Sequence, residues 1–317
     1  MSEKKALAQE TYDVVIIGGG PAGLTAGIYA ARRELKTLIL TRDIGGQITK
    51  TNIIENYPGF ELISGLDLAK KMFDQAKKCG AEIRFHEAKK ITKTKIGFSV
   101  DDGKNKIQTR SVILAFGKKP RELGVPGEKR LEGSGVSYCA TCDAPFFKNK
   151  VLTVVGGGNS ALCTAIIAAG VAKKVYLIYR GSELRGEQAM QEKLRKMNHV
   201  EIMYNEEVSE IVGEEKVESV KLKSGRILET DGVIIEIGFD IDRTLAAGLV
   251  NMDDKHQIII SANQETSVPG VFAAGDLTQT PAKQIVIATG EGAKAALSCY
   301  DYLQRASGKR GILADWH

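Results

Sequence analysis

The sequence lacks the features that mark secreted and nucleic-acid-binding proteins. Its five cysteines are an odd number, which does not suit a framework of paired disulfides. The segment before Val14 contains acidic residues and is followed by no small-residue cleavage site, so no signal peptide is expected. The 44 lysines and arginines are spread along the chain against 39 aspartates and glutamates, which predicts a solvated surface and no nucleic-acid partner. We therefore expect a cytoplasmic protein.

Long apolar runs without glycine are also missing, and histidine is scarce. Two stretches without charge, Val14–Ala31 and Val151–Ala172, could span a membrane by length, but each contains three consecutive glycines, which argues against a span. Cys79, Cys163 and Cys299 stand alone and the four histidines are scattered. A structural zinc site usually needs two Cys/His pairs, so neither a bound metal nor a membrane partner is expected.

What the sequence does contain is an internal repeat. The chain has 317 residues, 43% hydrophobic and 26% charged, which is enough for two globular domains. The segment Val14–Arg42, VVIIGGGPAGLTAGIYAARRELKTLILTR, aligns without a gap to Leu152–Arg180, LTVVGGGNSALCTAIIAAGVAKKVYLIYR. The pattern of each copy predicts a strand, a Gly-rich turn, an Ala-rich helix and a second strand.

The small residues of each copy have separate roles in a dinucleotide-binding turn. The first glycine permits the tight bend after the strand, and the second lets the backbone approach a pyrophosphate. The third position allows the helix to pack closely on the strand. In this order they are Gly18, Gly20 and Gly23 in the first copy, and Gly156, Gly158 and Ala161 in the second. Two copies in matching context predict two dinucleotides, whereas two such units without a ligand would leave these glycines unexplained.

The end of the second strand in each copy indicates which dinucleotide is bound. An acidic residue there usually holds ribose hydroxyls, and in the first copy Asp43 is near but late. The second copy has no acid at the strand end and carries Arg180 and Arg185 instead. Basic side chains suit a 2′-phosphate, so the second copy is interpreted as the NADPH side.

A third segment completes the architecture. The pattern of Val268–Leu303 predicts a strand, a Gly-Asp turn and a long helix. The predicted strand must pair with one of the sheets. Because the second copy already forms a compact domain, the tail should return to the first. The predicted fold is α/β, with two Rossmann-like dinucleotide-binding domains, the second inserted into the first. The expected segments are 1–119, 120–242 and 243–317.

Six motifs, in chain order, resemble those of low-molecular-weight thioredoxin reductases. They are GGGPAG (Gly18–Gly23), GGQ (Gly45–Gln47), ENYPGF (Glu55–Phe60), CATCD (Cys139–Asp143), GGGNSA (Gly156–Ala161) and AAGD (Ala273–Asp276). The resemblance implies a homodimer that binds FAD in the outer domain, formed by the first and third segments. It also implies that NADPH binds the inserted domain, and that a redox disulfide there reduces thioredoxin.

The same resemblance assigns cofactor-binding roles by position. Asp276 would take a ribityl hydroxyl, and Gln284 and Ile285 would meet the edge of the flavin ring. The other residues implied for FAD are Gly18, Gly20, Pro21, Ala22, Gly23, Gly45, Gly46, Gln47, Asn56, Gly117 and Gly275. Those implied for the nicotinamide dinucleotide are Gly156, Gly158, Asn159, Ser160, Ala161, Arg180 and Arg185.

The chain departs from the family pattern at several places. Ala115-Phe116-Gly117 stands for the usual Ala-Thr-Gly, and Cys163 and Thr164 replace two common acids. The pattern His-Arg-Arg-x-x-x-Arg becomes Tyr179-Arg180-Gly181-Ser182-Glu183-Leu184-Arg185, which lacks the middle arginine. This last departure bears on the choice of electron donor, for which NADH, ferredoxin or a reduced flavin are alternatives. A dinucleotide-sensing module with a structural CxxC is the non-enzyme alternative.

The Cys139–Cys142 pair is best interpreted as redox-active. A structural disulfide across two intervening residues would close a tiny loop and add little stability, and CxxC near βαβ elements is typical of a redox pair. Asp143 could serve as proton acceptor and donor if burial raises its pKa, or it could cap a helix over Ala144–Phe147. The resemblance favours the acid–base role. It also implies that Cys142 faces the flavin, that Cys139 attacks the protein substrate, and that the inserted domain rotates between two positions.

Overall fold

The computed structural model describes residues 11–50, 54–139 and 143–309, which form two compact units. The first unit holds the described residues of Met1–Thr49, Tyr57–Lys118 and Ile241–His317, and the second holds those of Lys50–Asn56 and Lys119–Asp240. The chain thus leaves the first unit at Lys118 and returns to it at Ile241. The predicted fold class, α/β with two Rossmann-like domains, is confirmed by the sheet topology. Cys142 lies outside the described residues.

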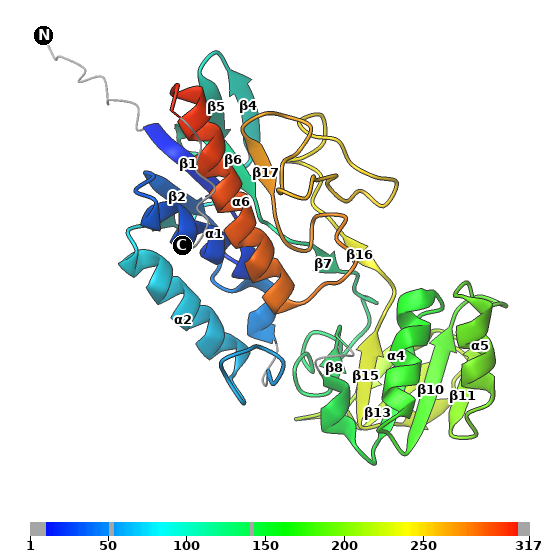
Figure 1. Cartoon of the computed structure of the whole chain (residues 1–317). Coiled ribbons are helices and arrows are strands. Elements are labelled where there is room, and N and C mark those ends of the chain that lie inside the picture. The colour runs from blue at the N-terminus through cyan, green and yellow to red at the C-terminus, as the bar shows by residue number, and fades with distance from the viewer. Residues whose placement is uncertain (1–10, 51–53, 140–142, 310–317) are drawn as a thin grey trace, which may run out of the picture. The chain divides into compact units, whose positions relative to one another are not determined.

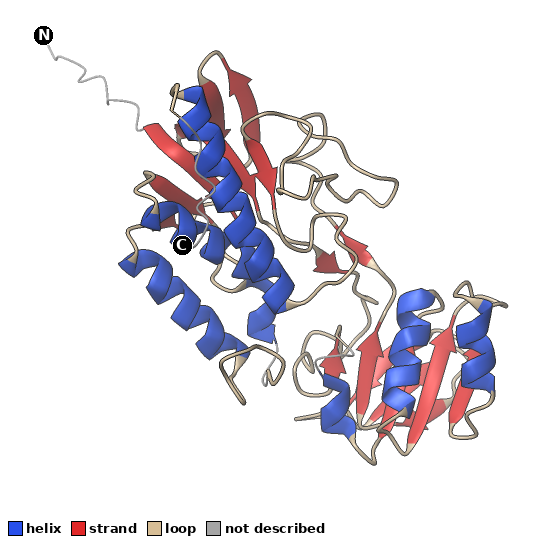
Figure 2. Cartoon of the chain, viewed as in Figure 1, coloured by secondary structure: helices blue, strands red, loops and turns tan. Residues whose placement is uncertain are grey.

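The first unit is built on a seven-stranded sheet (Figures 1 and 2). The strand order is β3-β2-β1-β6-β5-β4, and β17 pairs with β6 as well. Pairing is parallel among β1, β2, β3, β6 and β17, and antiparallel from β6 to β5 and β4. The bounds are β1 Thr11–Ile17, β2 Thr37–Leu40, β3 Glu82–Arg84, β4 Lys90–Thr94, β5 Gly97–Asp101, β6 Lys106–Leu114 and β17 Val271–Ala273.

Helices α1 (Pro21–Arg32) and α6 (Ile285–Ala306) lie against each other in the first unit (Figure 1). A Cβ atom at Gly292 of α6 would lie 2.1 Å from the carbonyl oxygen of Ala22, so only glycine allows this approach. Helix α2 (Gly65–Lys78) packs on α1, and the short 3₁₀ helix η1 spans Gly46–Lys50.

The second unit has a parallel sheet of its own, in the order β11-β10-β9-β15-β8. Helices α4 (Asn159–Ala169) and α5 (Gln188–Arg195) and the short 3₁₀ helix η2 (Ala144–Phe147) accompany it. The remaining strands form a three-stranded antiparallel sheet, β12-β13-β14, and an antiparallel pair, β7-β16, next to the two crossings. The bounds are β7 Lys119–Pro120, β8 Val136–Ser137, β9 Val151–Val155, β10 Lys174–Tyr179, β11 Val200–Tyr204, β12 Val208–Val212, β13 Ser219–Leu222, β14 Ile227–Glu229, β15 Gly232–Ile235 and β16 Phe239–Asp240.

The two units repeat one arrangement, as the sequence repeat predicts. Strand β1 lies between β2 and β6, and β9 lies between β10 and β15. The apolar runs form these central strands because both of their faces are covered: Val15 and Ile16 of β1 and Val154 of β9 are completely buried. In such sheets ligands bind at the carboxyl ends of the strands, where the order reverses.

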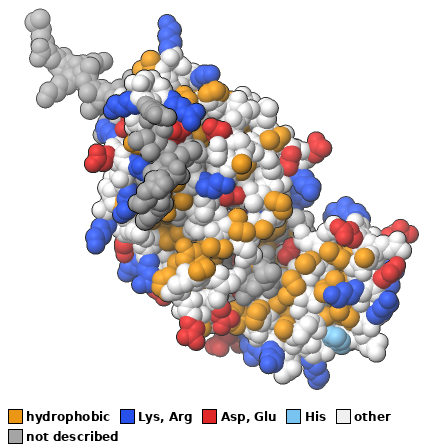
Figure 3. Space-filling model, in the orientation of Figure 1, with side chains coloured by type: hydrophobic (Ala, Val, Ile, Leu, Met, Phe, Trp, Pro, Cys, Tyr) orange, Lys and Arg blue, Asp and Glu red, His pale blue; other side chains and the backbone are white. Residues whose placement is uncertain are grey.

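On the face in Figure 3, positive and negative side chains are interspersed around scattered apolar ones. Within the described ranges, no helix is both long and apolar enough to cross a membrane.

Candidate functional site

The carboxyl ends of four parallel strands in the first unit bring together loops that are distant in sequence. Gly18 follows β1, Gly45 comes after β2, Gly117 after β6 and Gly275 after β17. The amide of Gly45 donates a hydrogen bond of 2.7 Å to the carbonyl oxygen of Gly19, which ties the second loop to the first. The predicted FAD motifs therefore meet at one edge of the sheet.

The three glycines of the first motif differ in what surrounds them. Gly18 has φ +115°, and a Cβ atom there would lie 2.4 Å from the carbonyl oxygen of Ala115. A Cβ atom at Gly23 would lie 1.9 Å from the carbonyl oxygen of Gly18. Gly20 differs, because its backbone is extended and its Cβ would meet only the Gly45 carbonyl oxygen, 3.8 Å away. Packing of the chain itself thus demands Gly18 and Gly23, so the expectation that these glycines would be unexplained without a ligand is wrong for these two. The space at Gly20 is open.

This open space lies at the N-terminus of α1, where an anion is favoured. Gly20 is the N-cap residue and Pro21 the first residue of the helix, followed by the buried Ala22. No side chain caps the helix, so its first amides stay available to a ligand. A pyrophosphate fits this arrangement of residues.

The Gly45–Gln47 turn is fastened to the neighbouring loops by hydrogen bonds. The carboxylate of Asp43 accepts from the amide of Gly46 at 3.2 Å, and the Thr41 hydroxyl donates to the Asp43 carbonyl oxygen at 2.6 Å. The side-chain amide of Gln47 donates to the carbonyl oxygen of Lys118 at 2.5 Å. Asp43 therefore shapes this turn, and Gln47 joins it to the loop after β6.

Asp276 is half-buried beside two lysines in the same unit. Burial raises the pKa of its carboxyl group, while the positive charges of Lys118 and Lys283 act in the opposite direction. Burial lowers the pKa of Lys283, whose ammonium donates to the carbonyl oxygen of Thr278 at 2.7 Å. No described residue forms a hydrogen bond to the Asp276 carboxylate. A half-buried carboxylate without a hydrogen-bond donor suits a hydroxyl group of a ligand.

Glu291 supports this loop, and the sequence reasoning missed it. Its side chain in α6 is only 7% exposed. One carboxylate oxygen accepts from the amide of Gly275 at 2.6 Å, and the other accepts from the hydroxyl of Thr280. A single acid within the apolar first half of α6 was the available signal, but only the structure shows that it faces inward.

The remaining predicted FAD residues are Gln284, Ile285 and Asn56, which lie outside the Gly-rich loops. Gln284 is the N-cap residue of α6 and Ile285 is its first residue, so both stand where α6 begins after the Asp276 loop. Asn56 is exposed and belongs to the segment Lys50–Asn56, which groups with the second unit. Its part in FAD binding stays a prediction.

The second motif has the same geometry as the first. Gly156 has φ +146°, and a Cβ atom there would lie 2.3 Å from a backbone oxygen at the end of β15. A Cβ atom at Gly158 would meet no atom within 4 Å, so the space before α4 is open. Ala161 is completely buried, and Asn159 and Ser160 are exposed at the N-terminus of α4. The residues present fit a second dinucleotide.

An aromatic ring occupies the strand end where the arginine motif is incomplete. The ring of Tyr179 lies between two glycines: a Cβ atom at Gly157 would be 2.3 Å from it, and one at Gly181 would be 2.7 Å from it. The guanidinium of Arg185 lies 5.8 Å from the centre of the ring. Arg180 and Arg185 are both exposed. The missing arginine at position 181 is thus linked to the tyrosine at position 179, because the ring fills the space that a side chain would need.

Hydrogen bonds connect the described residues on the two sides of the CxxC motif. Cys139 is disulfide-bonded, whereas Cys79, Cys163 and Cys299 are free. The amide of Asp143 donates to the carbonyl oxygen of Cys139 at 3.1 Å. Asp143 precedes η2 but makes no capping bond with its side chain, so the capping alternative is wrong. Burial raises the pKa of Asp143, as acid–base chemistry near neutral pH requires.

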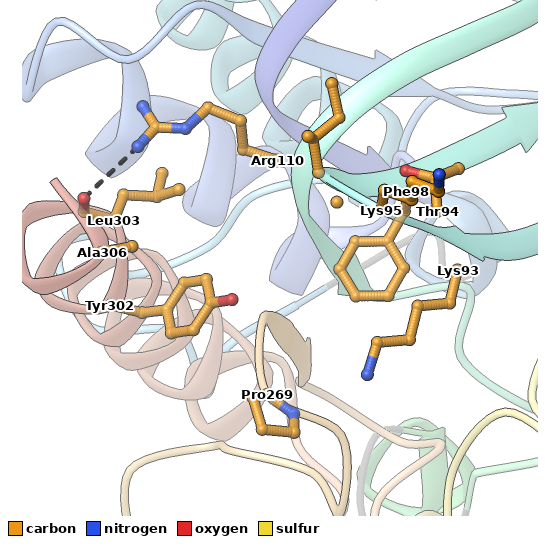
Figure 4. Close-up of a pocket in the computed structure, with 11 residues that line it drawn as sticks. Lys93, Thr94, Lys95, Phe98, Arg110, Pro269, Tyr302, Leu303 and Ala306 are labelled. Atoms are coloured by element: carbon orange, nitrogen blue, oxygen red, sulfur yellow. Dashed lines mark hydrogen bonds between the residues drawn. The ribbon is translucent and has the colours of Figure 1, made fainter.

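The pocket shown in Figure 4 lies in the first unit, away from the predicted FAD residues of that unit. It has a volume of about 240 Å³ and lies between the β4–β5 hairpin and the last turns of α6. Arg110 points along its wall toward the carbonyl oxygen of Leu303. Helix α6 is about 30 Å long, and the predicted FAD residues Gln284 and Ile285 stand at its other end. In the described part of the chain, no cluster of three or more His, Cys, Asp or Glu could hold a metal.

Comparison with known proteins identifies the family. Residues 12–294 match the family described as pyridine nucleotide-disulphide oxidoreductase, and the chain belongs to this family. It is 42% identical over 311 residues to the thioredoxin reductase of Bacillus subtilis, covering 96% of this chain and 97% of that protein. It is 40% identical over 306 residues to the thioredoxin reductase of Listeria innocua, covering 94% and 96%. The crystal structure of thioredoxin reductase from Streptococcus pyogenes superposes with a TM-score of 0.89 at 38% identity, covering 94% of this chain and 100% of that one.

These findings confirm the resemblance that the motifs indicated. The chain is an oxidoreductase whose family implies a flavin and a pyridine nucleotide as cofactors. The geometry described above offers one open Gly-rich turn for each of them.

Proposed function

We propose that this chain is an FAD-dependent thioredoxin-disulfide reductase that takes electrons from NADPH. The observation that carries the proposal is that disulfide-bonded Cys139 accepts a hydrogen bond from the amide of the half-buried Asp143, in the unit that also holds the second dinucleotide motif. Relatives named thioredoxin reductase, similar over nearly the whole chain, support it. The family resemblance further supports a cytoplasmic homodimer.

The two cofactors would be held by different units. Residues around Gly20, Gly46, Gly117 and Asp276 would hold FAD, and those around Gly158, with Arg180 and Arg185, would hold NADPH. FAD, when bound, would supply two-electron transfer between the nicotinamide and the disulfide.

Cys139, Cys142 and Asp143 would carry out the disulfide chemistry. Reduction breaks the Cys139–Cys142 bond, and the two sulfurs together take up two electrons and two protons. Asp143 would supply one of these protons and later take one back. Cys139 then attacks the disulfide of thioredoxin and forms a mixed disulfide. Cys142 resolves it, which restores the internal disulfide and releases thioredoxin with two thiols.

Anaerobic titration of the purified protein tests the electron path. We expect flavin absorption bands that bleach with NADPH, bleach much less readily with NADH, and return when oxidised thioredoxin is added. A folded protein that takes up no FAD would contradict the whole proposal. A flavin that stays oxidised with NADPH but bleaches with reduced ferredoxin would change only the donor.

The contact between the Tyr179 ring and position 181 leads to a specific prediction about nucleotide preference. An arginine at position 181 should add a contact to the 2′-phosphate worth about 1–2 kcal/mol, or roughly tenfold in affinity. Because its Cβ would lie 2.7 Å from the Tyr179 ring, Gly181→Arg alone should gain less than this. The double variant Tyr179→His/Gly181→Arg, with a smaller ring, should lower the KM for NADPH about tenfold and leave the KM for NADH nearly unchanged.

The control is Tyr179→His alone, which relieves the contact without adding a charge. Steady-state kcat/KM with both nucleotides is measured for the wild type and the three variants. A wild type that prefers NADH, or a double variant with an unchanged KM for NADPH, would show that this strand end does not bind a 2′-phosphate.

A further inference from the structure

Ser137 forms hydrogen bonds to the described residues on both sides of the CxxC motif. It is the last residue of β8, where it pairs in register with Ile234 of β15, and it is only 7% exposed. The backbone of Ser137 is therefore held by the sheet.

The hydroxyl joins the two residues that the disulfide chemistry requires. It donates a hydrogen bond to the Oδ2 atom of Asp143 and accepts one of 3.0 Å from the amide of Cys139. The carbonyl oxygen of Cys139 is a second possible acceptor, but it lies 3.4 Å from the hydroxyl, whereas the Oδ2 atom of Asp143 lies at 2.5 Å. The single proton of the hydroxyl is thus directed to the carboxylate.

Few other charged or titratable side chains lie near the CxxC motif to change the pKa of the Asp143 carboxyl group. The elements of this region, β8, β9, β15, η2 and α4, contain no Asp, Glu, Lys, Arg or His. Among the described residues, the cysteines of this region are Cys139 itself and the exposed Cys163 of α4, and the phenol of Tyr138 is bonded to Glu128 at 2.8 Å. Burial raises the pKa of Asp143, and the Ser137 hydroxyl lowers it.

We propose that Ser137 is a positioning residue for thiol–disulfide exchange: its hydroxyl orients the Asp143 carboxylate and anchors the backbone of Cys139. The proposal rests on the function given above, in which Asp143 supplies a proton to a departing sulfur. It adds a residue outside the CATCD motif to the exchange machinery.

The test measures how fast dithiothreitol opens the Cys139 disulfide in the full-length holoenzyme from pH 5 to pH 9. Opened thiols are counted by alkylation, so the measurement needs neither thioredoxin nor NADPH. For each variant the rate is divided by that of the wild type at the same pH, which removes the ionisation of dithiothreitol. Thioredoxin turnover of the wild type is recorded separately, so failure of the proposed function is distinguished from failure of this inference.

Ser137→Ala should lower the rate about tenfold at low pH, because the acid is no longer oriented. The relative rate should then rise with pH, since loss of a hydrogen bond to the charged carboxylate raises its pKa and keeps the acid form at higher pH. Ser137→Thr keeps a hydroxyl, so its rate at low pH should equal that of the wild type and its relative rate should not change with pH. Its recovery also shows that the alanine effect is not a failure to fold.

Tyr138→Phe is the matched control. It removes the hydrogen bond to Glu128 from the adjacent residue, while Glu128 keeps the amides of Leu123 and Gly124 as donors. Its relative rate should not change with pH. A pH-independent ratio for Ser137→Ala, or the same pH-dependent rise for Tyr138→Phe, would show that Ser137 merely stiffens the segment.

Discussion

Replacing Cys139 with serine should abolish thioredoxin reduction, by roughly a thousandfold or more, while NADPH still reduces the flavin at the wild-type rate. A hydroxyl neither forms a disulfide nor attacks one at neutral pH, so the loss should approach the whole contribution of the nucleophile. Hydride transfer to the flavin needs neither thiol. The two half-reactions are measured separately, by stopped-flow bleaching with NADPH and by re-oxidation with thioredoxin.

Cys142→Ser should give the same loss, because a single cysteine cannot close the internal disulfide. Cys163→Ser is the control in the same unit: this cysteine is free and exposed on α4, and its replacement should leave both half-reactions unchanged. Thioredoxin turnover at the wild-type rate in either Cys139→Ser or Cys142→Ser would refute the assignment of the working disulfide.

The repeated βαβ units were predictable because their signals are local. A fully buried parallel strand must be apolar along its length, and the turn after it requires glycine at Gly18 and Gly156 to avoid backbone atoms. Both requirements are visible in a window of about 30 residues. The same holds for CATCD, where the spacing of the cysteines close to a βαβ unit indicates redox chemistry.

The supporting residues were not predictable because their roles depend on tertiary contacts. Glu291 follows the Gly275 turn by 16 residues, and nothing in the helix sequence shows that it accepts from that turn. Ser137 resembles any strand serine until β15 fixes its direction. At position 181 the sequence showed only a missing arginine, whereas the structure shows that the Tyr179 ring takes up the space.

Substitution of the middle glycine of each motif should show which unit binds FAD and which binds NADPH. Gly20 and Gly158 both have extended backbones with negative φ, and a Cβ atom at either would meet no atom closer than 3.8 Å. Alanine at these positions is therefore compatible with the folded chain. It should matter only when a pyrophosphate approaches the backbone, where an added methyl group would displace it from the helix N-terminus.

We expect Gly20→Ala to reduce FAD affinity about a hundredfold, close to 3 kcal/mol, and to yield a colourless protein after dialysis. Gly158→Ala should keep its FAD and raise the KM for NADPH by a similar factor, with thioredoxin re-oxidation unchanged. Since alanine is a poorer N-cap residue than glycine, serine variants at both positions serve to correct for helix stability, because serine caps well but also carries a Cβ. Circular dichroism and the melting temperature of the FAD-free proteins check that the fold is kept.

The two variants contradict the cofactor assignment in different ways. Gly20→Ala with wild-type FAD affinity would mean that the first turn does not hold the pyrophosphate of FAD. Loss of FAD from Gly158→Ala, with normal FAD binding by Gly20→Ala, would mean that the two units have been assigned the wrong dinucleotides. The same change at Gly18 or Gly23 could not decide this, because a Cβ there would lie 2.4 Å or 1.9 Å from a carbonyl oxygen of the chain itself. Only the glycines that the fold does not need can report on the ligand.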